Sequence, residues 1–214
     1  MAVDILPTDA LLVIDLQNDF CPAVDAVGGA LAVAGAHEIV PTINALAQKF
    51  EHVLLTQDWH PSGHISFAST HAGAEAYTQI EAHYGPHMLW PVHCVQHSQG
   101  AALHPALDVP HAELILRKGF RCDIDSYSAF LENDHRTPTG LAGYLRERGL
   151  TRLFLAGLAY DFCVRFSAID GKALGFETVV IEDATRAVGL PGSIEDTHAA
   201  LAQAGVPRIE SSTL

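Results

Sequence analysis

Asp58, His60 and His64 lie within seven residues, in the run Asp-Trp-His-Pro-Ser-Gly-His. If a strand ends at Asp58, alternate residues point the same way, so Asp58 and His60 can share an ion. His93, in the run Trp-Pro-Val-His, can complete the ligand set. A carboxylate with imidazoles suits zinc, iron or manganese and leaves positions open for water or substrate. The spacing favours one divalent metal ion over the alternative, a polar loop whose histidines are capped and solvated.

Cys163 follows the segment Gly157-Leu-Ala-Tyr-Asp-Phe, where a predicted strand gives way to a predicted helix. The positive end of a helix dipole and its free N–H groups lower the pKa of a cysteine in the first turn. The same N–H groups can stabilise an oxyanion. These features predict a nucleophilic thiolate, although a core cysteine on an apolar helix face explains the pattern equally well.

Asp15 follows the wholly apolar segment 10–14, and Lys118 follows the segment 113–117, which is apolar at its centre; we predict both segments to be strands. A carboxylate at such a position is costly unless it is paired or used in chemistry. Together the two side chains resemble a base and a cation beside a nucleophile. A structural ion pair at the sheet edge is the alternative, and Cys163 favours the catalytic interpretation.

Short apolar runs alternate with amphipathic segments along the chain, which predicts an α/β fold with a central, mostly parallel sheet. The carboxyl ends of parallel strands form the usual ligand site, so Asp15, Asp58, Lys118 and the loop at Gly157 are expected at one edge. The predicted strands are 10–14, 52–56, 113–117, 152–156 and 178–181, and the predicted helices are 34–50, 139–148, 161–174 and 193–204, with Thr139 and Ser193 as N-caps.

The length of 214 residues suits a single domain spanning 1–214, and no linker-like tract divides it. Residues 59–110 break the pattern of strands and helices. They are rich in His, Gly, Pro and Ser, and nine of the thirteen histidines lie between His60 and His111. A long irregular insertion of this kind is usually functional or disordered. We expect this insertion to contribute to binding of the metal and the substrate, while most of its histidines have no assigned role.

The charge balance and the apolar runs exclude several classes of partner. A formal net charge of −13 argues against nucleic acid and against anionic membrane surfaces. No apolar run is long enough to span a bilayer, and the N-terminal segment lacks the basic region of a signal peptide. We therefore expect a cytoplasmic protein whose four cysteines stay reduced. Whether copies of the chain associate into a homo-oligomer is left open.

The familiar glycine-rich and histidine-rich catalytic motifs are absent. The chain has no Gly-x-Gly-x-x-Gly, Walker-A, Gly-x-Ser-x-Gly or His-Glu-x-x-His motif. Dinucleotide-binding, nucleotide-binding, serine hydrolase and zincin functions therefore have no support from the sequence.

Six segments in their order along the chain resemble the nicotinamidase/pyrazinamidase branch of the isochorismatase-like cysteine hydrolases. This resemblance implies a single-domain, three-layer α/β/α fold with Rossmann-like topology. The segments are Leu12–Phe20, Asp58–Phe67, Trp90–Cys94, Lys118-Gly119, Ile124–Phe130 and Gly157–Val164.

The resemblance implies hydrolysis of nicotinamide, and of pyrazinamide, to the acid and ammonia by a catalytic triad of Asp15, Lys118 and Cys163. It implies one divalent metal on Asp58, His60 and His93, with His64 as a further ligand in some members. It also implies a cis peptide between Leu158 and Ala159, and an oxyanion hole formed by the N–H groups of Ala159 and Cys163. Residues matching the family's substrate pocket are Phe20, Trp90, Tyr127 and Leu158.

Two alternatives remain from the sequence. The chain could be a sibling hydrolase acting on isochorismate, N-carbamoylsarcosine or a ureido acid, although those branches generally lack the metal-ligand pattern. It could also be a non-enzymatic module that stores zinc or nickel. That second alternative explains the histidines but leaves Asp15, Lys118 and Cys163 without a role.

Overall fold

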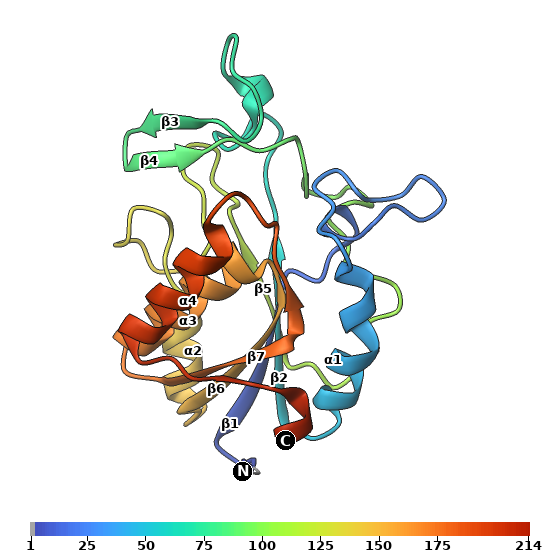
Figure 1. The fold of residues 1–214 in the computed structure, drawn as a ribbon, viewed down its shortest axis with the longest axis vertical. Coiled ribbons are helices and arrows are strands. Elements are labelled where there is room, and N and C mark those ends of the chain that lie inside the picture. Colours follow the sequence, from blue (N-terminus) through green and yellow to red (C-terminus); the bar gives the residue numbers. More distant parts are fainter. Residues whose placement is uncertain (1–2) are drawn as a thin grey trace.

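A six-stranded, entirely parallel sheet forms the centre of the protein in a computed structural model, which describes residues 3–214 (Figure 1). The strand order is β5-β2-β1-β6-β7-β8. This arrangement confirms the predicted α/β class and the parallel sheet. The strands are β1 (Asp9–Ile14), β2 (His52–Asp58), β5 (Leu114–Lys118), β6 (Arg152–Leu158), β7 (Glu177–Arg186) and β8 (Arg208–Ile209).

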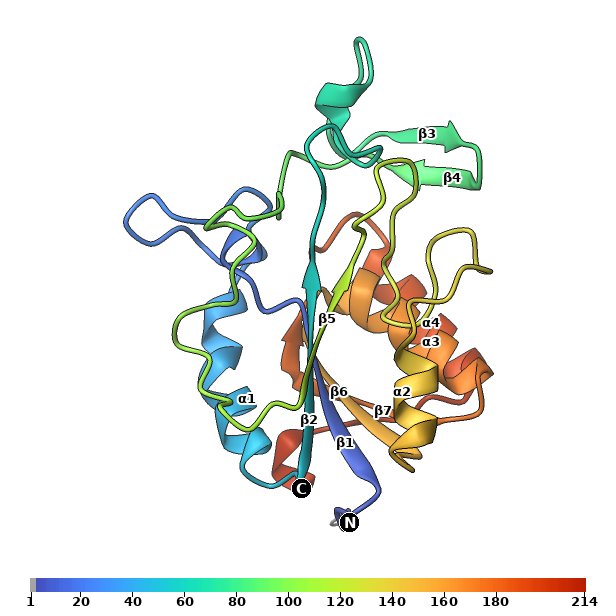
Figure 2. The ribbon, with the colours of Figure 1, turned by 180° about the vertical axis from the view of Figure 1, so that it is seen from behind.

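Helices cover both faces of the sheet and bury two separate cores (Figures 1 and 2). Alternate residues of one strand serve the two cores, because successive side chains point to opposite faces. In β1, Leu11 shares a core with Ile43 of α1, whereas Leu12 shares the other core with Leu145 of α2. The helices are α1 (Val40–Ala47), α2 (Leu141–Glu147), α3 (Arg165–Ala173) and α4 (Ser193–Ala204).

The helix starts differ from the sequence prediction. The predicted helix 34–50 divides into a 3-10 helix, Ala36–Ile39, and the shorter α1, which has proline in its first turn. Glycines in the left-handed region precede α2 and α4, so the predicted N-caps Thr139 and Ser193 are wrong. The Thr139 hydroxyl donates to a backbone carbonyl and the Ser193 hydroxyl to a carboxylate, each at 2.6 Å. Thr139 Oγ1 also accepts the N–H of Leu141, the first residue of α2, at 3.3 Å, but Gly140 occupies the N-cap position.

The first part of the irregular segment 59–110 lies beyond the carboxyl ends of the strands, and its last residues run back beside α1, where Asn44 donates to the carbonyl of Ala106 (Figure 1). It contains a short 3-10 helix, Ala68–Thr70, and a hairpin of β3 (Gln79–Ala82) and β4 (Gly85–Met88). The hairpin was not predicted, because its strands are short and its connecting residues, His-Tyr, are not typical turn formers.

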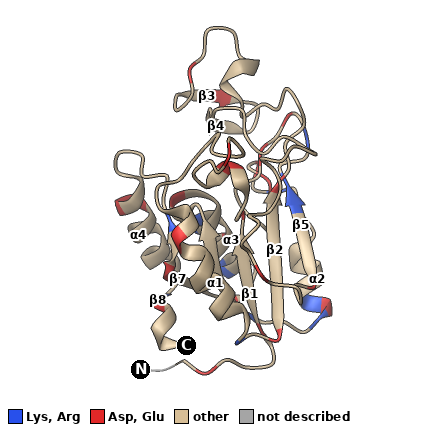
Figure 3. Cartoon of the chain, turned by 90° about the vertical axis from the view of Figure 1, so that its right-hand side faces the viewer, with Lys and Arg blue, Asp and Glu red and all other residues tan. Residues whose placement is uncertain are grey.

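Acidic residues are spread over helices and loops, and basic residues are fewer (Figure 3). Within residues 3–214, no helix is long and apolar enough to cross a membrane.

Gly157 allows β6 to lie against the end of β1. Its φ is +108°, and a Cβ at this position would lie 2.1 Å from the carbonyl oxygen of Ile14. Asp15 follows Ile14 directly, so this close contact fixes the backbone from which the Asp15 side chain projects.

We predict that Gly157→Ala destabilises the protein by about 3 kcal/mol, because it adds a backbone clash to an unfavourable φ. Gly175→Ala is the matched control. Gly175 has a φ of +94°, but a Cβ added there would meet no atom within 4 Å, so this change should cost only about 1–2 kcal/mol. Urea unfolding of both variants measures the difference, and equal losses would contradict the role of the close contact.

Candidate active site

Lys118, the last residue of β5, occupies the centre of a buried group of ionisable side chains. Its ammonium lies 2.8 Å from Oδ2 of Asp15 and also contacts Oδ1 of Asp58. It donates a further hydrogen bond to the carbonyl of Ser126 at 2.9 Å. The structure therefore brings Asp15 and Lys118 together as predicted, and one cation serves two carboxylates.

Asp15 follows β1 with a φ of +47° and is completely buried. The hydroxyl of Thr56 donates to Oδ1 of Asp15 at 2.6 Å and accepts the Asp15 N–H at 3.1 Å. Burial raises the pKa of the Asp15 carboxyl, and Lys118 opposes this rise. Thr56 was not predicted, although it is the one hydroxyl in the strand segment 52–56.

Cys163 lies in a single π-helical turn, Tyr160–Val164, between β6 and α3. Its Sγ lies 3.3 Å from Nζ of Lys118 and within 4.8 Å of carboxylate oxygens of Asp15 and Asp58. Burial raises the pKa of the Cys163 thiol well above its ordinary value, with Lys118 opposing. The predicted lowering of this pKa is therefore wrong, because loss of solvent outweighs the favourable charge.

The peptide between Leu158 and Ala159 is cis, as the family resemblance implies. Ala159 lines a cavity that also reaches Cys163. The Leu158 side chain, by contrast, is fully buried in the core beneath α1 and does not line this cavity. The expectation that Leu158 lines the substrate pocket is therefore wrong. Leu158 is the last residue of β6, and its side chain points into the core.

Asp58, His60 and His93 form a buried group whose ligand atoms all lie within 4.8 Å of one another. Nε2 of His60 is 3.5 Å and Nε2 of His93 is 3.8 Å from Oδ2 of Asp58. The Nδ1 atoms instead face the carbonyls of Gly119 and Pro91, at 2.9 and 2.8 Å. With Nδ1 as the donor, each Nε2 presents a lone pair toward Asp58. This is how proteins orient metal-binding histidines, so the donor set fits a divalent ion.

His64 does not belong to this group. It stacks on His60 with ring centroids 4.1 Å apart. Its Nδ1 lies 2.7 Å from Oγ of Ser66 and its Nε2 lies 3.2 Å from the carbonyl of Ile124. Burial lowers the pKa of His64 to about 4. The expectation of His64 as a further ligand to Asp58 and His93 is not met, since both ring nitrogens are directed elsewhere.

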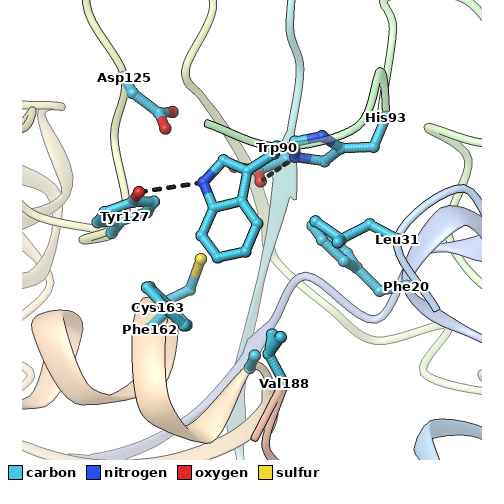
Figure 4. Close-up of a pocket in the computed structure, with 11 residues that line it drawn as sticks. Phe20, Leu31, Trp90, His93, Asp125, Tyr127, Phe162, Cys163 and Val188 are labelled. Atoms are coloured by element: carbon cyan, nitrogen blue, oxygen red, sulfur yellow. Dashed lines mark hydrogen bonds and ion pairs between the residues drawn. The ribbon is translucent and has the colours of Figure 1, made fainter. Parts of the chain in front are cut away.

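One cavity connects the thiol with the metal-ligand group (Figure 4). Cys163 and His93 both line it, and the Asp58 carboxylate lies within 4.8 Å of the Cys163 sulfur and of a ring nitrogen of His93. The predicted pocket residues Phe20, Trp90 and Tyr127 all line it. The indole N–H of Trp90 donates to the Tyr127 hydroxyl at 3.1 Å, which fixes the plane of the indole.

Four residues of the cavity wall were not predicted: Leu31, Asp125, Phe162 and Val188. Asp125 and Phe162 could have been predicted, because they belong to the segments Ile124–Phe130 and Gly157–Val164, which the sequence had already indicated. Leu31 and Val188 are ordinary apolar residues of loops and could not have been predicted.

Comparison with protein families agrees with this geometry. The isochorismatase domain family matches residues 9–211. A nicotinamidase from Acinetobacter baylyi is 51% identical over 205 residues, which cover 96% of this chain and 94% of that protein.

Solved structures resemble the chain over nearly its whole length. A nicotinamidase and pyrazinamidase from Acinetobacter baumanii has a TM-score of 0.93 and 52% identity, and covers 97% of this chain and 98% of its own. The L. infantum protein PnC1 in complex with nicotinate has a TM-score of 0.86 and 40% identity, covering 100% and 98%.

A pyrazinamidase from Pyrococcus horikoshii in complex with zinc has a TM-score of 0.76 and 31% identity, covering 95% of this chain and 99% of its own. Fold, site geometry and sequence agree, and the chain belongs to the isochorismatase family.

Proposed function

We propose that this chain hydrolyses nicotinamide to nicotinate and ammonia, with Cys163 as the nucleophile. One observation carries the proposal: a buried thiol and a group of metal ligands line the same aromatic cavity. A substrate with an amide at one end and a ring nitrogen at the other matches that arrangement. The identity to a nicotinamidase and the likeness to a nicotinate-bound structure support this choice of substrate.

Asp58, His60 and His93 would hold one divalent ion, and the zinc-bound relative supports zinc, while iron and manganese suit the same donors. When bound, the ion supplies an electron-pair acceptor for the pyridine nitrogen of the substrate. The ring of the substrate would then lie between Phe20 and Trp90, which line the cavity. Such fixed orientation can lower a barrier by several kcal/mol.

The first half-reaction uses Asp15 as the base. Its carboxylate takes the proton of the Cys163 thiol, and Sγ forms a bond to the amide carbon as the C=O electrons move to oxygen. The N–H groups of Ala159 and Cys163 would stabilise this oxyanion. The intermediate collapses when the C–N bond breaks and Asp15 returns the proton to nitrogen, which releases ammonia and leaves a thioester.

The second half-reaction returns the enzyme to its resting state. Asp15 takes a proton from water, the water oxygen attacks the thioester carbon, and the C–S bond breaks. Asp15 passes the proton that it took from water to the Cys163 sulfur, and nicotinic acid leaves and loses its own proton to solvent as nicotinate. Lys118, 2.8 Å from Asp15, stabilises the carboxylate form of the base at both stages.

Two rival functions are less well supported. A sibling hydrolase for N-carbamoylsarcosine or a ureido acid leaves the Asp58, His60 and His93 group without a purpose. A metal-storage module leaves the Asp15, Lys118 and Cys163 group without one.

We also infer a cytoplasmic location, because all four cysteines are unpaired. The proposed product, nicotinate, suits both NAD salvage and a catabolic route. Residues 1–214 would act as one domain, with the 59–110 insertion completing the site.

Ammonia release is the direct test of the substrate. We expect the purified protein to release ammonia from nicotinamide and from pyrazinamide, which keeps a ring nitrogen in the same place. Benzamide lacks this nitrogen, so its kcat/KM should be lower by at least about 100-fold. Equal rates on benzamide would contradict recognition of the ring nitrogen.

Cys163→Ala is the control for the nucleophile and should abolish release while the metal content stays unchanged. Cys122→Ala, at an exposed thiol, should retain full activity. Unchanged metal in Cys163→Ala would also exclude a metal on Asp15, Asp58 and Cys163, where the Lys118 ammonium already lies.

His60→Ala tests the metal-ligand set. We predict that it loses bound metal and raises KM, because the ring nitrogen of the substrate loses its partner. Metal analysis by mass spectrometry, together with steady-state kinetics, measures both effects. His37→Ala, at an exposed histidine, is the control and should match the wild type. Full metal content in His60→Ala would contradict the assignment.

A further inference from the structure

Asp125 is a buried carboxylate with no lysine or arginine beside it in the part of the chain that the structure describes. Its side chain is only 3% exposed and forms part of the cavity wall (Figure 4). Oδ1 accepts the N–H of Ser126 at 2.7 Å. The ionisable group that approaches Oδ2 is His87, at 3.7 Å, and across residues 3–214 no lysine or arginine lies within 4 Å of this carboxylate.

Two other buried carboxylates, Asp161 and Asp9, are satisfied by groups of the protein. Asp161 accepts hydrogen bonds from the N–H groups of Val188 and Gly189, both at 2.9 Å, and from the Ser193 hydroxyl at 2.6 Å. Asp9 is paired with the guanidinium of Arg152. A buried charge is costly unless it is paired. Among residues 3–214, the ionisable groups near Asp125 are imidazoles, His87 at 3.7 Å and His60 and His64 within 4.8 Å, and no lysine or arginine supplies a permanent positive charge.

Asp125 lies next to the residues of the proposed metal site. Its carboxylate lies within 4.8 Å of ring nitrogens of His60 and His64. It also shares the cavity wall with Asp58 and His93. His60 is therefore common to the proposed metal site and to the surroundings of Asp125.

The charges of the buried group point the same way. Among residues 3–214, Lys118 is the one ammonium in contact with Asp15 and Asp58. With Asp15, Asp58 and Asp125 ionised and Lys118 protonated, these four side chains carry a net charge of about −2. One divalent cation neutralises that charge. Salt screens buried charges only weakly, so the Asp125 carboxylate can attract an ion held by the neighbouring metal-ligand group without touching it.

We propose that Asp125 is an outer carboxylate of the metal site, which raises the affinity of Asp58, His60 and His93 for a divalent ion through its charge. Asp125 does not join Asp58 and His93 in the same ligand group, so it is a positioning residue rather than a ligand. This inference rests on the proposed metal site.

The test compares Asp125→Asn with Asp161→Asn, a matched change at a satisfied carboxylate. Each full-length protein is freed of metal with a chelator, and zinc binding is then measured by calorimetry and thermal unfolding. We expect Asp125→Asn to lower zinc affinity by about 10- to 100-fold. Without metal, its unfolding midpoint should equal or exceed that of the wild type, because an unpaired charge is gone. Asp161→Asn should lower the midpoint with and without zinc and leave zinc affinity unchanged.

Asp125→Glu separates charge from packing. It keeps the charge and should retain more zinc affinity than Asp125→Asn, and this comparison remains informative if the Asn variant folds poorly. Wild-type affinity in Asp125→Asn, or equal losses in the Asn and Glu variants, would overturn the inference. A wild-type protein that binds no zinc would instead contradict the proposed metal site itself.

Discussion

The buried ammonium of Lys118 is the interaction on which the rest of the site depends. It lies 2.8 Å from Asp15, contacts Asp58 and lies 3.3 Å from the sulfur of Cys163. Two carboxylates could not remain ionised this close together in a dry interior without such a cation. Lys118 therefore joins the proposed catalytic base and the proposed metal ligand in one charged group, and it places the thiol beside both.

The parallel sheet explains why these side chains meet. Asp58 and Lys118 are paired across β2 and β5, and Ile14 is paired with Gly157 across β1 and β6. Each functional residue thus lies at or just beyond the carboxyl end of a strand whose interior is fixed by apolar packing. The 59–110 segment then adds His60, His93 and Trp90 above this edge and closes the cavity. Rigid strands supply the reacting groups, and the insertion supplies recognition.

The sequence predicted the parts of this arrangement that follow from local pattern. Apolar runs located the strands, and polar residues at their ends located Asp15, Asp58 and Lys118. Properties of a side chain that depend on its neighbours in the folded protein could not be predicted from the sequence. Burial reverses the expected direction of the Cys163 pKa, and neighbouring acceptors turn His64 away from the metal group. The surroundings of Asp125, which among residues 3–214 include imidazoles but no lysine or arginine, are likewise a property of the folded interior.

The central claim is that the Cys163 sulfur, held beside Lys118 and Asp15, bonds to the carbonyl carbon of the substrate. Acid quenching of the enzyme during turnover of nicotinamide, followed by mass spectrometry of the peptide that contains Cys163, measures this most directly. The account predicts a nicotinoyl thioester on Cys163 and on none of the other three cysteines. Steady ammonia release with an unmodified Cys163 at every quench time, or an adduct on another residue, would contradict it.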